Sequence, residues 1–142
     1  MKTLILVLSL FCVNLYAPPS PDRPTKEQSY QFTILTNPQF RIYYPLIKAI
    51  VYVESRGNDS AFNELEGAKG AFQIREIRLN HYNRLTGKNY QHDEMFDYYK
   101  SLEVFLFFAE GKTFKKAAKS WNGSGPMTVE YWRKVNNQLS QL

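Results

Sequence analysis

Residues 45–57 read PLIKAIVYVESRG and predict a helix that begins at Pro45 and ends near Gly57. Proline is suited to the first turn of a helix, and glycine to the position just after the last turn. The apolar residues of this segment recur at spacings of three and four, which places them on one face with Glu54. These apolar residues are Ile47, Ile50 and Val51. Glu54 therefore points the same way as the apolar face, where burial would raise the pKa of its carboxyl group towards neutrality.

The rest of the sequence predicts one mainly helical domain over residues 30–142, with a small irregular or hairpin element after the first helix. Further helices are expected over residues 75–85, 97–109 and 114–121, and a last helix is expected to be capped by Thr128. The expected buried stripes are Leu102, Phe105, Leu106 and Ala109 in one helix and Val129, Trp132, Val135 and Leu139 in the last. Residues 71–74 are expected to form a short extended run.

The N-terminus has the pattern of a secretory signal peptide over residues 1–17. A lysine directly after the initiator precedes a short apolar run, and Ala17 offers a small residue for cleavage. Because Leu15 is bulky and Pro18 would follow the cut, an uncleaved N-terminal anchor is the alternative. Residues 18–29, PPSPDRPTKEQS, form a Pro-rich lead-in that predicts a tether. The sequence thus predicts an exported protein of the periplasm or cell envelope.

Charge and composition argue against several classes of function. The chain carries a formal net charge of +5, but its basic residues are scattered without a nucleic-acid-binding motif, so no nucleic acid is expected as a partner. The only cysteine, Cys12, lies in the predicted leader, and the only histidines are His81 and His92. The exported domain therefore offers no thiol nucleophile and no disulfide, and neither a metal site nor a cofactor is expected.

Three segments in order carry a resemblance to a known family. The pair Glu54–Ser55 ends the first helix, GAKGAFQI follows at residues 67–74, and AKSWNGSG ends a later helix at residues 118–125. Together they resemble the soluble lytic transglycosylase type of the lysozyme-like superfamily, over residues 43–135. The resemblance implies a mainly α (α+β) lysozyme-like fold with the hairpin element beside the active-site cleft.

The resemblance also implies roles for individual residues. Glu54 is the catalytic acid and base, Ser55 and Gln73 line the cleft, Asn122 contacts the sugar or the reacting centre, and Tyr131 walls the site. Taken alone, a serine at a helix end, a glutamine on a short strand and an Asn-Gly turn all have ordinary structural explanations. The assignment of Ser55, Gln73 and Asn122 therefore depends on their occurrence together with Glu54.

The chain departs from the family pattern in several places. The loop after Glu54 is slightly longer, and Asp59 stands where a proline is common. Phe72 and Trp121 replace a frequent Met and Tyr, which keeps an apolar wall and bears on glycan specificity more than on the reaction. The longer loop leaves the position of Gln73 open.

The expected function is that of a peptidoglycan lytic transglycosylase, a lyase that acts on glycan strands as a monomer. In the family mechanism one Glu suffices, because the N-acetyl group of the sugar assists and the sugar's own 6-hydroxyl closes a 1,6-anhydro ring. Two alternatives remain open: a lysozyme-like hydrolase, in which Asp59, Glu64 or Glu66 orients a water, and a non-catalytic glycan-binding module. A partner in an envelope or secretion machinery is compatible with each of these.

Overall fold

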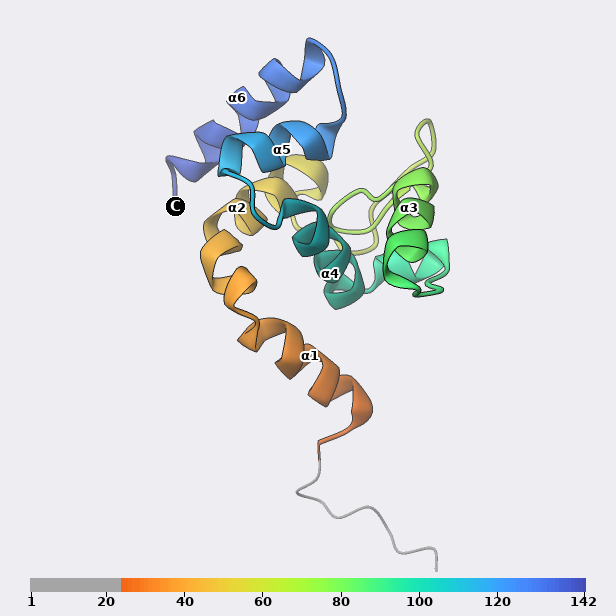
Figure 1. Cartoon of the computed structure of the whole chain (residues 1–142). Coiled ribbons are helices and arrows are strands. Elements are labelled where there is room, and N and C mark those ends of the chain that lie inside the picture. The colour runs from red at the N-terminus through yellow and green to blue at the C-terminus, as the bar shows by residue number, and fades with distance from the viewer. Residues whose placement is uncertain (1–23) are drawn as a thin grey trace, which may run out of the picture.

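Helices dominate the computed structural model, which describes residues 24–142 (Figure 1). Its elements are α1 (Lys26–Thr36), α2 (Pro38–Ser55), β1 (Phe62–Asn63), β2 (Ala68–Lys69), α3 (Glu76–Thr86), the 3-10 helix η1 (His92–Phe96), α4 (Tyr98–Ala109), α5 (Phe114–Asn122) and α6 (Met127–Leu139). The expected mainly helical class is confirmed, with a small hairpin after α2. No helix within residues 24–142 is both long and apolar enough to cross a membrane. The predicted signal peptide, residues 1–17, lies outside the described residues.

The helix that carries Glu54 begins earlier than expected. It starts at Pro38, where the side chain of Asn37 accepts a hydrogen bond from the Gln39 amide, and Pro45 lies inside it. Asn37 and Pro38 supply a cap and a favourable first residue, so the later proline does not define the start. Pro45 costs α2 a backbone hydrogen bond, and it lies at an exposed position of the helix.

The Pro-rich lead-in is not a tether throughout, because its last residues form the first turn of α1. The Thr25 hydroxyl accepts a hydrogen bond from the Gln28 amide, and the Gln28 side chain accepts one from the Thr25 amide. This reciprocal pair is a capping box, which stabilises a helix start. The ordered domain therefore begins before residue 30, the boundary expected from the sequence.

A polar cluster centred on Glu103 of α4 holds α1 against the body of the molecule. The Glu103 carboxylate accepts hydrogen bonds from the hydroxyls of Tyr82 at 2.7 Å and Tyr90 at 2.8 Å. It also accepts from Tyr30 of α1 and from the ammonium group of Lys88. Burial alone would raise the pKa of Glu103, but these donors outweigh it and lower the pKa below its ordinary value. The cluster thus keeps a charged carboxylate satisfied where α1, α3 and α4 meet.

The later helices lie close to their expected bounds, and the buried stripe of α4 is confirmed. The last helix differs from the expectation. It begins at Met127 rather than after a Thr128 cap, and Val129 is 61% exposed. Val135 of the expected stripe is buried, and Trp132 and Leu139 are partly buried against the core. Thr128 and Tyr131, which were not expected in the stripe, complete the buried face of α6.

The hairpin is followed by a turn that contains Gln73, one of the predicted site residues. Residues 71–74 are not extended as expected, since residues 70–73 form a turn. The φ angles of its first and last residues are positive, +77° at Gly70 and +49° at Gln73. A Cβ atom on Gly70 would lie 1.8 Å from the carbonyl oxygen of Met95, so the backbone of η1 packs directly against this glycine. The two strands pair antiparallel, with Phe62 opposite Lys69 and Asn63 opposite Ala68.

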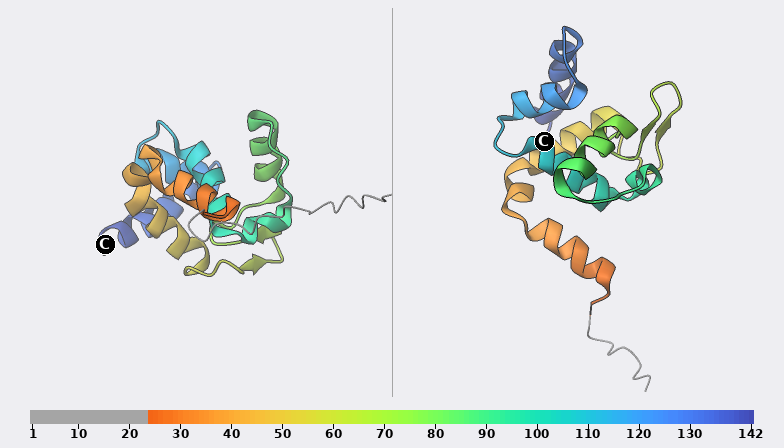
Figure 2. Two further views of the ribbon diagram at one scale, coloured as in Figure 1. Left: turned by 90° about the horizontal axis from the view of Figure 1, so that it is seen from below. Right: turned by 45° about the vertical axis from the view of Figure 1, so that its right-hand side comes forward.

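The long helix α2 is central to the core. It packs on α1, α4, α5 and α6, and α5 and α6 pack on each other. In Figures 1 and 2 the hairpin and α3 stand apart from α5 and α6, with the end of α2 between them. The fully buried side chains that join these elements include Leu46, Ile50, Phe72, Phe105 and Val135. This arrangement leaves the last turn of α2, and therefore Glu54, between two separate groups of elements.

Candidate active site

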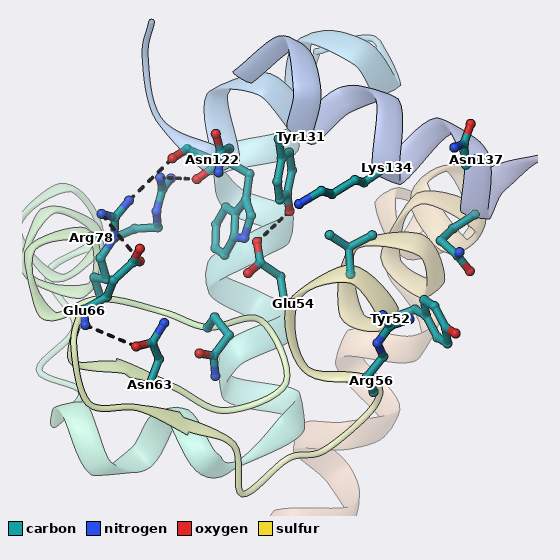
Figure 3. A pocket seen from close by; sticks show the side chains of 15 residues that line it. Tyr52, Glu54, Arg56, Asn63, Glu66, Arg78, Asn122, Tyr131, Lys134 and Asn137 are labelled. Carbon is teal, nitrogen blue, oxygen red and sulfur yellow. Dashed lines mark hydrogen bonds and ion pairs between the residues drawn. The ribbon is translucent and has the colours of Figure 1, made fainter. Parts of the chain in front are cut away.

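A cleft of about 530 Å³ opens at the C-terminal end of α2 (Figure 3). Its walls come from the end of α2, the hairpin, the start of α3, the end of α5 and one face of α6. The volume is within the range of small-molecule sites, about 300–1,000 Å³. Four of the five predicted site residues line it: Glu54, Gln73, Asn122 and Tyr131. The fold thus brings together residues as far apart in sequence as 77 positions.

Glu54 occupies the last turn of α2, and its carboxyl group points towards Tyr131 of α6 (Figure 3). The Tyr131 hydroxyl donates a 2.6 Å hydrogen bond to Glu54 Oε1. Burial raises the pKa of Glu54 to about 7, and the negative charge of Glu66 adds to the rise. The Tyr131 hydrogen bond and the charges of Arg75 and Arg78 act in the opposite direction. At neutral pH both the protonated and the ionised form of the Glu54 carboxyl group are therefore populated.

Two arginines that the sequence analysis did not single out close one end of the cleft. The Arg78 guanidinium donates to the Trp121 carbonyl oxygen at 2.6 Å and lies over the Trp121 ring, 4.4 Å from its centroid. Arg75 donates to the Asn122 carbonyl oxygen at 3.5 Å and lies 3.9 Å from the Glu66 carboxylate. Both reach from the start of α3 to the C-terminal end of α5, where unpaired helix carbonyls favour cations. The sequence signal that could have pointed to this pair is that Arg75 and Arg78 are three residues apart, which places both side chains on one side of a helix.

Ser55 has a supporting position and is not among the residues that line the cleft. Its hydroxyl donates to the Ala71 carbonyl oxygen at 2.9 Å and also lies 3.1 Å from the Val51 carbonyl oxygen. The first of these contacts joins the end of α2 to the turn that carries Gln73. Ser55 therefore acts on the geometry of the cleft through the backbone.

Gln73 and Asn122 both line the cleft, from the turn after the hairpin and from the end of α5. The Gln73 side-chain amide donates to the carbonyl oxygens of Gly70 at 3.0 Å and Ala61 at 3.2 Å, so its nitrogen holds the hairpin and the turn together. Asn122 is the last residue of α5, and Gly123 follows it with a φ of +134°. The chain therefore leaves the helix directly after Asn122, at the edge of the cleft.

The three loop acids differ in their relation to the cleft. Glu66 lines it opposite Glu54, with 57% of its side chain exposed. Asp59 and Glu64 are also exposed, but neither lines the cleft. Of the three acids considered for the hydrolase alternative, only Glu66 therefore faces the same space as Glu54.

The described residues contain no group of three or more His, Cys, Asp or Glu that could hold a metal ion. His81 is exposed, and the His92 ring lies 2.8 Å from the Ile74 carbonyl oxygen, within hydrogen-bonding distance.

No protein-family model matches the chain, and no curated protein or solved structure matches it. The geometry of the cleft is therefore the basis on which a function has to be argued.

Proposed function

We propose that this chain is a peptidoglycan lytic transglycosylase with a lysozyme-like fold. It would cleave the β-1,4 bond between N-acetylmuramic acid and N-acetylglucosamine and leave a 1,6-anhydromuramyl end. The observation that carries the proposal is a carboxyl group, that of Glu54, with a pKa of about 7 inside an open cleft. A group that must first give a proton and then take one back works best with a pKa near the operating pH. The resemblance of the three sequence segments supports the same activity.

The hydrogen bond from Tyr131 determines which oxygen of Glu54 acts as the acid. Oε1 accepts the hydrogen bond that the Tyr131 hydroxyl group donates. In neutral Glu54 the acidic proton therefore belongs on Oε2, the oxygen that remains to meet the glycosidic oxygen of a bound glycan. When Glu54 ionises, the same Tyr131 hydroxyl stabilises the carboxylate. Tyr131 thus serves both halves of an acid/base cycle.

The reaction proceeds in two balanced steps. In the first, Glu54 transfers its proton to the glycosidic oxygen, the bond from that oxygen to the muramic acid C1 breaks, and the N-acetyl oxygen bonds to C1. In the second, the sugar's 6-hydroxyl oxygen bonds to C1, the N-acetyl oxygen leaves, and the hydroxyl proton passes to Glu54. The enzyme returns to its starting form and no water is consumed. A second catalytic carboxylate is not needed.

A lysozyme-like hydrolase is the second candidate, and the position of Glu66 is the observation that favours it. Glycosidases that use two carboxyl groups hold them on either side of the bond to be cleaved. Glu66 lines the same cleft as Glu54, and its charge raises the pKa of Glu54. However, Glu66 is exposed and lies 3.9 Å from Arg75, which favours a role in ion pairing over one in activating water.

Product analysis tests the proposal directly. Purified peptidoglycan would be incubated with the full-length chain, and the released fragments identified by mass spectrometry. The lyase should release 1,6-anhydromuramyl fragments, each lighter by one water than the product of hydrolysis. Reducing muramic acid ends would favour the hydrolase instead. Glycan binding without cleavage would indicate a non-catalytic binding module. The control is Glu54→Gln, which should release no fragments in this assay.

A further inference from the structure

The cleft has two cationic ends, and they differ in what their cations contact (Figure 3). At one end Arg75 and Arg78 are engaged by Glu66 and by carbonyl oxygens at the end of α5. At the other end, Arg56 and Lys134 line the cleft. Within residues 24–142 neither of these two forms an ion pair with a carboxylate. One end of the cleft therefore has cations that are available to a ligand.

Arg56 is held at the mouth of the cleft by its backbone and by an aromatic ring. It follows the last residue of α2 and has a left-handed φ of +57°. This conformation disfavours residues with a side chain, and glycine is the usual choice. Its guanidinium carbon lies 4.4 Å from the centroid of the Tyr52 ring, which also lines the cleft. This contact places the guanidinium group beside the Tyr52 ring at the edge of the cleft.

Lys134 belongs to the face of α6 that forms the opposite wall. It lies three residues after Tyr131, the hydrogen-bond partner of Glu54, and so projects from the same side of the helix. In Figure 3 its side chain extends along the cleft in the direction of Tyr131. Asn137 and Gln138 continue this wall with two side-chain amides. The two cations and two amides surround space that is continuous with the space in front of Glu54.

This chemistry suits a carboxylate better than it suits a neutral sugar. Guanidinium and ammonium groups form strong, charge-assisted hydrogen bonds to carboxylates, and the amides suit a peptide backbone. In peptidoglycan a peptide with free carboxyl groups is attached to the lactyl group of muramic acid, next to the bond that would be cleaved. We propose that Arg56 and Lys134 bind a carboxylate of this peptide, so that the enzyme selects peptide-bearing strands over bare glycan. The inference rests on the proposed function.

The test compares two forms of one substrate: glycan fragments that carry the peptide with its free carboxyl groups, and the same fragments after those carboxyl groups have been converted to neutral amides. Binding to the full-length chain would be measured by calorimetry and the cleavage rates by chromatography. A charge-assisted contact should give the wild type a preference of about 10- to 100-fold for the form whose peptide carboxyl groups are free. R56Q/K134Q should reduce this preference to near equality. Raising the ionic strength should weaken the preference of the wild type.

The matched control is K115Q/K116Q, which removes the same charge from exposed positions of α5 that do not line the cleft. This variant should keep the wild-type preference. Equal binding of both forms by the wild type, or a preference that survives in R56Q/K134Q, would overturn the inference. Cleavage without any preference would refute the carboxylate site and leave the lyase standing. A preference in binding that R56Q/K134Q abolishes, with cleavage of neither form, would support the site and refute the lyase.

Discussion

Replacing Tyr131 by phenylalanine removes one hydroxyl group from the cleft and leaves the ring in place. That hydroxyl donates the 2.6 Å hydrogen bond to Glu54 Oε1 and is the strongest of the influences that lower the pKa of Glu54. A hydrogen bond to a charged group contributes about 1.5–3 kcal/mol, and about 1.4 kcal/mol corresponds to one pH unit in pKa. We therefore expect Tyr131→Phe to raise the pKa of Glu54 above its value of about 7 by about 1–2 pH units.

The effect on activity follows from the form of Glu54 that reacts. Cleavage begins with protonated Glu54, so kcat/KM should be high below the pKa and should fall as the pH rises through it. The wild type should lose activity as the pH rises above about 7, and Tyr131→Phe should do so only above about pH 8–9. The measurement is the initial rate of release of soluble fragments from peptidoglycan across the neutral and alkaline range.

Tyr43→Phe provides the matched control. Tyr43 belongs to α2, the helix that carries Glu54. Its hydroxyl donates to the Ala109 carbonyl oxygen at 2.6 Å, and Tyr43 does not line the cleft. Its removal should lower the stability of the fold by about 1 kcal/mol and leave the pH profile in place. An alkaline limb that does not move in Tyr131→Phe, or that moves to lower pH, would refute the role assigned to this hydrogen bond. Equal shifts in both variants would also refute it.

Three further predictions concern substitutions of Glu54, Glu66 and Gly70. Glu54→Gln should reduce cleavage by about 10²–10⁴-fold or more. As the pH rises from 4.5 to above 7, the wild type should lose about 3 kcal/mol of unfolding free energy in urea, because the buried carboxyl group must ionise. Glu54→Gln has no carboxyl group at this position and should not show this loss. Glu66→Gln should cost a lyase little activity and lower the pKa of Glu54, moving the alkaline limb to lower pH, whereas a large loss with reducing-end products would indicate the hydrolase. Gly70→Ala should cost roughly 3 kcal/mol or more in urea unfolding, because its Cβ would meet the Met95 backbone; Gly67→Ala, which meets nothing within 4 Å, should cost about 1–2 kcal/mol.

The position of Glu54 could be predicted because helical periodicity is a local property. Its spacing from Ile47 and Ile50 placed it on the buried face whether the helix began at Pro45 or, as observed, at Pro38. The boundary itself was wrong, because a proline marks a helix start only where the chain before it is not already helical. In the last helix the same periodicity predicted correctly that Val135 is buried and that Trp132 and Leu139 pack against the core, but Val129, in the first turn, is exposed.

The electrostatic part of the cleft could not be predicted from local pattern. Arg75 and Arg78 act on Glu54 only because α3 is brought against the end of α5, and that contact depends on the tertiary fold. Arg56 lies between Ser55 and Gly57 at the predicted end of the first helix, and nothing in its sequence neighbours reveals that its side chain lies over Tyr52. The sequence also suggested an apolar surrounding for Glu54, whereas its pKa results from burial opposed by a hydroxyl group and two cations.

The attachment of α1 has a consequence for how the molecule bears mechanical load. Figure 1 shows α1 leading away from the rest of the fold, so a pull on residue 24 acts first on this helix. Helix α1 is attached to the rest of the fold by the hydrogen bond from Tyr30 to Glu103 and by the buried side chain of Ile34. Another large apolar residue of α1, Phe32, is 68% exposed. Under tension α1 should therefore peel off before α2 is strained. Such a detachment would leave the packing around Glu54 intact while the N-terminal end of the chain is pulled.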